Sequence, residues 1–153
     1  MRSIAILGVG AVCAVAAFAL FFVVYDTSER EHRTLCARNA SFVVDIADTP
    51  ELRTKGLSGT PMLKEGAGML FVFPSPGMYG FWMNDMQYSL DIMWLDSAMR
   101  VVYALENIAP ETFPEVFTNP VPAQYVLEVP AGTMQRYGIQ EGDAVGPCVP
   151  RTF

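Results

Sequence analysis

The sequence has little histidine and few basic residues. His32 is the only histidine among 153 residues. This excludes a Ser-His-Asp triad and a histidine-based metal site, because both need several converging side chains. Ten Lys and Arg against sixteen Asp and Glu argue against nucleic acid as a partner, since its phosphates require basic patches. No run of like charge suggests a lipid-binding surface, and no phosphate-binding glycine loop of the usual spacing is present.

Cysteine is equally scarce. Of the three cysteines, Cys13 lies in an apolar stretch, and only Cys36 and Cys148 lie outside it. These two lack the Cys-x-x-Cys spacing of redox centres. An even pair near the two ends of a domain favours a structural disulfide in an oxidising compartment, with two unpaired thiols as the alternative.

A long charge-free run occupies the N-terminus. Ile4 to Val24 contains 21 residues without a charge, about 31 Å as a helix, which matches a bilayer core of about 30 Å. We therefore predict a transmembrane anchor or uncleaved signal over residues 1–25, with the membrane as partner through residues 4–24. A cleaved signal is the alternative, but an apolar stretch follows the small residues Ala17 and Ala19 where a polar region is expected. Either way, the pattern predicts a globular domain in the periplasm or outside the cell.

Short apolar runs dominate the rest of the chain. We predict a polar tether over residues 26–40 and a β domain over residues 41–153, with a short helix opened by Thr49-Pro50, a turn at Pro74–Gly77 and a second helix within Ala131–Tyr137. Ala109–Pro122 carries four prolines and predicts a surface loop. The expected fold is mainly β, a compact sandwich or barrel-like sheet with two short helices, preceded by the transmembrane helix. The expected strands are Ser41–Ala47, Met69–Phe73, Tyr79–Met83, Ile92–Leu95, Arg100–Glu106, Gln124–Val129 and Ala144–Cys148.

The stretch from Tyr79 to Asp96 is the expected centre of this domain. It holds both tryptophans, Trp82 and Trp94, in two runs that are apolar on both strand faces. Such strands are usually covered on both sides. We therefore expect Trp82 to be buried between two layers.

The same stretch supplies the candidate site residues. Asp85 and Asp91, with Glu106 beyond it, could provide the acid and base of a glycoside hydrolase. Turn chemistry explains such aspartates equally well, and at Asp91 we expect backbone hydrogen bonds that hold the link from Asn84 to Leu90. For ligand binding the candidates are Tyr79, Trp82, Asp91 and Trp94, because large rings offer flat apolar surfaces to a peptide, a sugar or a partner protein.

Methionines near the central stretch raise a copper(I) hypothesis, because thioethers favour that ion. Met83, however, alternates with Phe81 as a core residue does, and methionine commonly fills irregular cores. We therefore expect neither a metal nor a cofactor.

Five motifs, in order, resemble the domain of unknown function 192 family. The resemblance spans roughly Phe42 to Val149 and implies a compact, mainly β domain, often behind a signal or anchor, with no established activity. Asn84-Asp85-Met86 stands where family members often read Lys-Asn-Thr, so a role of that lysine does not carry over. The motifs are Asp48-Thr49-Pro50-Glu51 with Lys55-Gly56-Leu57, Gly68-Met69-Leu70-Phe71-Val72-Phe73-Pro74, Phe81-Trp82-Met83, Leu90-Asp91-Ile92 with Leu95-Asp96, and Tyr125-Val126-Leu127-Glu128-Val129-Pro130-Ala131-Gly132.

The sequence thus favours a membrane-anchored, extracytoplasmic binding or interaction module over an enzyme. Its expected ligand is an envelope protein, a peptide or a glycan. The alternative is a carboxylate-dependent hydrolase of envelope glycans.

Overall fold

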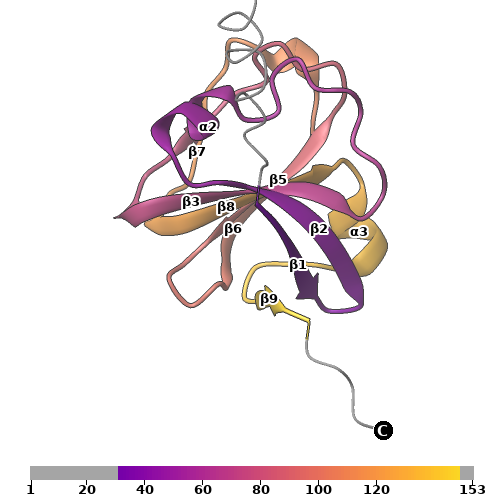
Figure 1. The fold of residues 1–153 in the computed structure, drawn as a ribbon, viewed down its shortest axis with the longest axis vertical. Helices are drawn as coiled ribbons and strands as arrows, with labels where there is room; N and C mark the ends of the chain where they lie inside the picture. Colours follow the sequence, from indigo (N-terminus) through magenta and orange to yellow (C-terminus); the bar gives the residue numbers. More distant parts are fainter. Residues whose placement is uncertain (1–30, 149–153) are drawn as a thin grey trace, which may run out of the picture.

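A computed structural model describes residues 31–148 of the chain. One seven-stranded sheet has the order β6-β5-β8-β3-β2-β1-β9, and β4 and β7 form a separate two-stranded ribbon (Figure 1). The strands are β1 (His32–Ala37), β2 (Ala40–Ala47), β3 (Ala67–Gly77), β4 (Gly80–Phe81), β5 (Leu90–Leu95), β6 (Val101–Ile108), β7 (Phe117–Thr118), β8 (Ala123–Pro130) and β9 (Val145–Pro147). The helices are α2 (Pro50–Lys55), α3 (Thr133–Tyr137) and the 3-10 turn η1 (Pro110–Thr112).

The large sheet curls into a half-barrel. Its two outer strands approach each other where the residues before β9 meet the start of β6. There Val101 N–H donates to the Asp143 carbonyl at 2.9 Å, and Gly142 N–H donates to the Val101 carbonyl at 2.7 Å. The predicted mainly β fold with two short helices is therefore confirmed, in its barrel-like rather than its sandwich form.

Local sequence explains both helices. Thr49 caps α2 by accepting a hydrogen bond from Leu52 N–H at 3.2 Å, Pro50 takes the first helical position, and Gly56 ends the helix. Gly138 ends α3 in the left-handed conformation, with φ of 65°, which glycine adopts without steric cost.

Both faces of the sheet are covered. Leu35, Phe42, Leu127 and Val145 belong to the core inside the half-barrel. Phe71, Phe81, Trp94 and Val126 belong to a second core on the opposite face, beneath α2 and the long loops. All six residues of β5 are buried. The expectation of a doubly covered central strand therefore holds for β5.

Trp82 does not follow that expectation. The predicted strand Tyr79–Met83 is reduced to Gly80–Phe81, which pairs only with β7. The ladder of that ribbon ends at Phe81 and does not include Trp82, and Trp82 is 53% exposed. Its ring meets Phe113 with 5.8 Å between centroids. The prediction that Trp82 is buried between two layers is wrong.

Two other predictions need correction. His32–Ala37, expected in the tether, forms β1 instead, because a short turn lets it pair with β2 in an antiparallel hairpin. Pro74–Gly77, expected as a turn, continues β3 through an irregularity in register between Val72 and Gly77, where proline is tolerated because no ladder hydrogen bond is lost.

The N-terminal prediction lies outside the described residues. This applies to the anchor over residues 1–25 and to residues 26–30 of the tether. Within residues 31–148, no helix is long and apolar enough to cross a membrane.

The domain's ends are joined covalently. Cys36 in β1 and Cys148 after β9 form a disulfide, with 4.9 Å between their Cα atoms. Their strands are antiparallel neighbours, with Cys36 opposite Gly146. The bridge therefore reinforces an edge pairing between residues far apart in the chain.

Candidate functional site

Asp91 is a buried structural carboxylate. It has no exposed area, and its oxygens accept three backbone hydrogen bonds, from Asn107 N–H (2.9 Å), Gly132 N–H (3.2 Å) and Met134 N–H (2.9 Å). Asn107 has a φ of 54°, which non-glycine residues rarely adopt. Asp91 thereby holds this bend and the N-terminus of α3, and not the link from Asn84 to Leu90 that we expected.

The other candidate carboxylates do not gather around Asp91. Asp85 lies in an exposed loop with a φ of 54°, and its carbonyl accepts a hydrogen bond from Gly59 N–H at 2.9 Å. Glu106 is exposed near the end of β6. In the part of the chain that the structure describes, no group of three or more His, Cys, Asp or Glu could hold a metal ion.

The aromatic candidates separate into core and surface. Trp94 is fully buried, and its indole N–H donates to the Tyr79 carbonyl at 3.0 Å. Tyr79 is further fixed by Asn119, whose side-chain oxygen accepts from Tyr79 N–H at 2.8 Å. Tyr79 and Trp82 both line a cavity, whereas Trp94 is not part of its lining.

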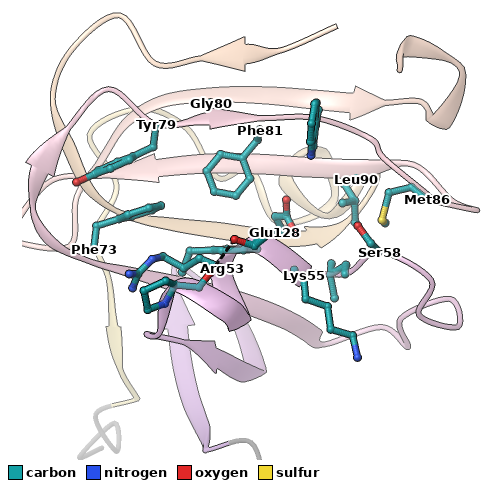
Figure 2. A pocket seen from close by; sticks show the side chains of 16 residues that line it. Arg53, Lys55, Ser58, Phe73, Tyr79, Gly80, Phe81, Met86, Leu90 and Glu128 are labelled. Atoms are coloured by element: carbon teal, nitrogen blue, oxygen red, sulfur yellow. Dashed lines mark hydrogen bonds between the residues drawn. The ribbon is translucent and has the colours of Figure 1, made fainter. Parts of the chain in front are cut away.

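That cavity, of about 350 Å³, lies on the loop-covered face of the sheet (Figure 2). Phe71 and Phe73 of β3 contribute to it with Glu128 of β8, and α2 with the following loop contributes Arg53, Lys55 and Ser58. The opposite wall is the segment from Tyr79 to Trp82. The lining residues are Pro50, Arg53, Thr54, Lys55, Gly56, Leu57, Ser58, Phe71, Phe73, Tyr79, Gly80, Phe81, Trp82, Met86, Leu90 and Glu128.

Hydrogen bonds hold the loops of this cavity in place. Ser58 hydroxyl donates to the Asn84 carbonyl at 2.8 Å. Thr60 and Tyr88 share a hydrogen bond of 2.9 Å between their hydroxyl oxygens. The loop after α2 is thereby tied to the loop before β5.

The rings of the cavity form a fixed array. Phe73 and Tyr79 are stacked, with 3.5 Å between centroids and 10° between planes. Phe81 meets Phe71 edge-on, with 4.8 Å between centroids. The Arg53 guanidinium lies 5.3 Å from the Phe73 ring centre and donates to the carbonyls of Asp48 (2.6 Å) and Val72 (2.7 Å). The Arg53 guanidinium thus already has hydrogen-bonding and aromatic partners within the protein.

Glu128 is the unusual residue of the cavity. Its side chain is 5% exposed. No described residue donates a hydrogen bond to its carboxyl group or forms an ion pair with it. Burial raises the pKa of Glu128 to about 8, because removal from water disfavours the charged form. Figure 2 shows its carboxyl group inside the cavity, between Phe81 and Leu90 in this view.

Glu128 is not among the site residues predicted from the sequence. In β8 it alternates against the apolar Leu127 and Val129, a pattern typical of a strand with one solvated face. A signal was nevertheless present, because Val126 shares the side of Glu128 and marks that face as covered. A perturbed carboxyl in a cleft is a recognised indicator of a functional site.

A second cavity, of about 490 Å³, is lined by residues including Leu35, Leu70 and Tyr125. Its charged lining residues, Arg33 and Asp48, are both exposed. It offers no buried ionisable group, so the Glu128 cavity is the stronger candidate site.

Solved structures with a similar fold include two bacterial proteins. A protein from Sinorhizobium meliloti 1021, described as a candidate transcription regulator, aligns with a TM-score of 0.72 and 26% identity, covering 76% of this chain and 93% of its own. A protein of unknown function from Novosphingobium aromaticivorans DSM 12444 aligns with a TM-score of 0.73 and 28% identity, covering 80% and 89%. Among curated proteins, none matches significantly. Residues 33–146 match DUF192, described as uncharacterized ACR, and the chain therefore belongs to the DUF192 family.

Proposed function

We propose that this protein is a binding module that holds a small ligand, or a small part of a larger one, in the Glu128 cavity. One observation carries the proposal: a buried carboxyl without a described partner opens into an aromatic-lined cavity. Ligand sites typically combine apolar walls with a few well-placed polar groups and occupy about 300–1,000 Å³. The cavity of about 350 Å³ falls within that range.

Tyr79 and Trp82 are the proposed contact residues. Tyr79 is held rigidly by Asn119, by Trp94 and by stacking on Phe73. Trp82, with 53% of its surface exposed, can cover a ligand from the cavity rim. Rigid rings bind at low entropic cost because few rotatable bonds are frozen.

The hydrolase alternative receives less support. Glycoside hydrolysis normally uses two carboxyl groups on either side of the bond. Glu128 is the only Asp or Glu among the described residues that line the cavity. Asp91 is saturated by backbone amides, and neither Asp85 nor Glu106 is part of the lining.

The description of the Sinorhizobium protein suggests transcription regulation as another function. A formal net charge of −6 opposes it, because binding to phosphates depends on basic residues. We therefore do not extend that description to this chain.

The site is proposed to act outside the cytosol, anchored through residues 4–24. The support is the charge-free length of Ile4–Val24 and a disulfide, a bond that persists mainly in oxidising compartments. N-terminal sequencing and membrane fractionation test the anchor. A mature chain that begins near Leu20 would refute it.

Binding is tested by NMR with a library of small amines, sugars, carboxylates and dipeptides. Thr54 of α2 is among the lining residues, so Thr54→Trp adds a large ring at the cavity wall. Val43→Trp, at an exposed position that does not line the cavity, is the matched control. We expect binding that shifts the Trp82 indole signal, disappears in Thr54→Trp and persists in Val43→Trp. A library with no such compound would overturn the proposal.

A further inference from the structure

The position of Glu128 in the sheet fixes its carboxyl group inside the cavity. In β8 the residue lies opposite Met69 of β3 and Ile92 of β5. Strands therefore flank it on both sides, and the backbone cannot swing it to the surface. Among the described residues, no side-chain oxygen is both fully buried and without a hydrogen-bond partner, so the unpartnered Glu128 carboxyl must be reached from the cavity. A carboxylate in such a largely buried position is stabilised by a charged, hydrogen-bonding partner. The missing partner therefore indicates that the ligand carries a group that can pair with a carboxylate.

Among residues 31–148, no Lys, Arg or His serves as that partner. Arg53 is engaged with two carbonyls and the Phe73 ring. In Figure 2 the Arg53 guanidinium and the Lys55 ammonium both extend away from Glu128. No described ion pair includes Glu128. The carboxyl group thus remains available to a cation from outside.

The surrounding rings favour a cation that carries an apolar chain. Phe71, Phe73, Tyr79, Phe81 and Trp82 line the cavity, and aromatic faces attract cations. Arg53 above Phe73 already shows one such contact. The ring edges and Leu90 would cover methylene groups, whose removal from water favours binding.

We propose that the cavity binds a small primary alkylamine, with its ammonium group at the Glu128 carboxylate and its alkyl chain against Phe71, Phe81 and Leu90. This inference rests on the proposed binding function and specifies its ligand class. A primary ammonium is preferred because its three N–H donors can satisfy the empty acceptor sites of the carboxylate. The negative net charge of the chain also attracts cations towards the protein.

Binding of an ammonium is coupled to a proton. The other ionisable groups near the cavity are Arg53 and Lys55 of α2, Tyr79, and Tyr88 before β5. Burial raises the pKa of Tyr88. Since burial raises the pKa of Glu128 to about 8, the carboxyl is mostly protonated at pH 7 and must release its proton to pair with the ammonium. Affinity should therefore increase between pH 6 and pH 8.

The test uses n-butylammonium as the probe, with 1-butanol and butyrate as neutral and anionic controls of similar length. Binding to the full chain is measured by NMR at pH 6 and pH 8, and the Glu128 carboxyl is titrated with and without the amine. We expect n-butylammonium to bind at least tenfold more tightly than either control at pH 8 and to lower the pKa of Glu128. Glu128→Gln should lose at least tenfold in amine affinity and keep its affinity for 1-butanol.

The outcomes separate this inference from the binding function. If 1-butanol binds as tightly as the amine, or if Glu128→Gln binds the amine unchanged, the ammonium inference is refuted while the cavity remains a ligand site. If no probe and no library compound perturbs the cavity signals, both proposals are refuted. An unchanged Glu128 titration in saturating amine refutes the pairing even where Glu128→Gln fails to fold.

Discussion

Replacing Asp91 by Asn tests whether this carboxylate is structural. One Asp91 oxygen accepts from Asn107 N–H and Gly132 N–H, and the other accepts from Met134 N–H. The amide of Asn has a single acceptor oxygen, so its NH₂ group must face at least one of these donors. A hydrogen bond to a charged group contributes about 1.5–3 kcal/mol, and an unsatisfied buried donor adds a penalty. We expect Asp91→Asn to lower the free energy of unfolding by about 2–4 kcal/mol.

Asp96→Asn is the matched control for this prediction. Asp96 also accepts two backbone hydrogen bonds, from Ala98 N–H (2.8 Å) and Arg100 N–H (2.9 Å), but both reach the same oxygen. Asn can keep both with its carbonyl, so we expect a loss below about 1 kcal/mol. Urea unfolding followed by circular dichroism measures both variants. If Asp91→Asn is as stable as the parent, the structural assignment fails and a catalytic role regains support.

Three further predictions follow from the same structure. Trp94→Ala should lower the free energy of unfolding by about 3–5 kcal/mol, because it leaves a cavity in the core. Trp82→Ala, at a half-exposed position, should lower it by about 1 kcal/mol or less. Equal losses for the two variants in urea melts would contradict the observed burial. Cys36→Ser with Cys148→Ser should cost about 2–5 kcal/mol, because the bridge closes a separation of 112 residues; a parent whose stability is insensitive to reductant would argue against it. Glu128 should make the free energy of unfolding depend on pH, because its pKa is about 8 in the folded protein and about 4.3 in the unfolded chain. The free energy of unfolding is highest below about pH 4.3 and falls by up to about 5 kcal/mol as pH rises through 8. Glu128→Gln should remove this loss, and urea melts at pH 5 and pH 8 that retain it would assign it to another group.

Much of the fold could be predicted because local signals agree with it. The cap and proline of α2, the glycine after α3 and the alternation of β2 each determine structure within a few residues. Trp82 could not be placed in this way. Its burial depends on whether a partner strand covers its second face, and the pairing of β4 with β7 joins segments more than thirty residues apart. Sequence pattern identifies an apolar residue but not the loop that covers it.

The prediction of a tether over the residues of β1 was wrong for a related reason. The charged and polar residues of this strand resemble a tether, yet its backbone pairs with β2 and β9, and backbone hydrogen bonds do not depend on the polarity of exposed side chains. Three of its first residues, His32, Arg33 and Thr34, are exposed. Because β9 pairs only with Leu35, Cys36 and Ala37, the first half of β1 forms the edge of the sheet there, and its polar side chains are consistent with the way proteins avoid edge-to-edge aggregation.

Glu128 shows why the candidate site was harder to predict than the fold. On alternation alone its side chain belongs in solvent, and the fold places it beneath α2 and loops that come from elsewhere in the chain. An apolar residue at this point would fill the same space without the cost of burying a carboxyl group. Where a residue breaks the local rule and no structural partner compensates, function is the usual reason. Asp91 provides the contrast, because it is buried just as deeply but has every backbone partner that a structural carboxylate needs. The presence of hydrogen-bonding partners at Asp91 and their absence at Glu128, and not the number or spacing of the carboxyl groups in the sequence, indicate Glu128 as the ligand contact.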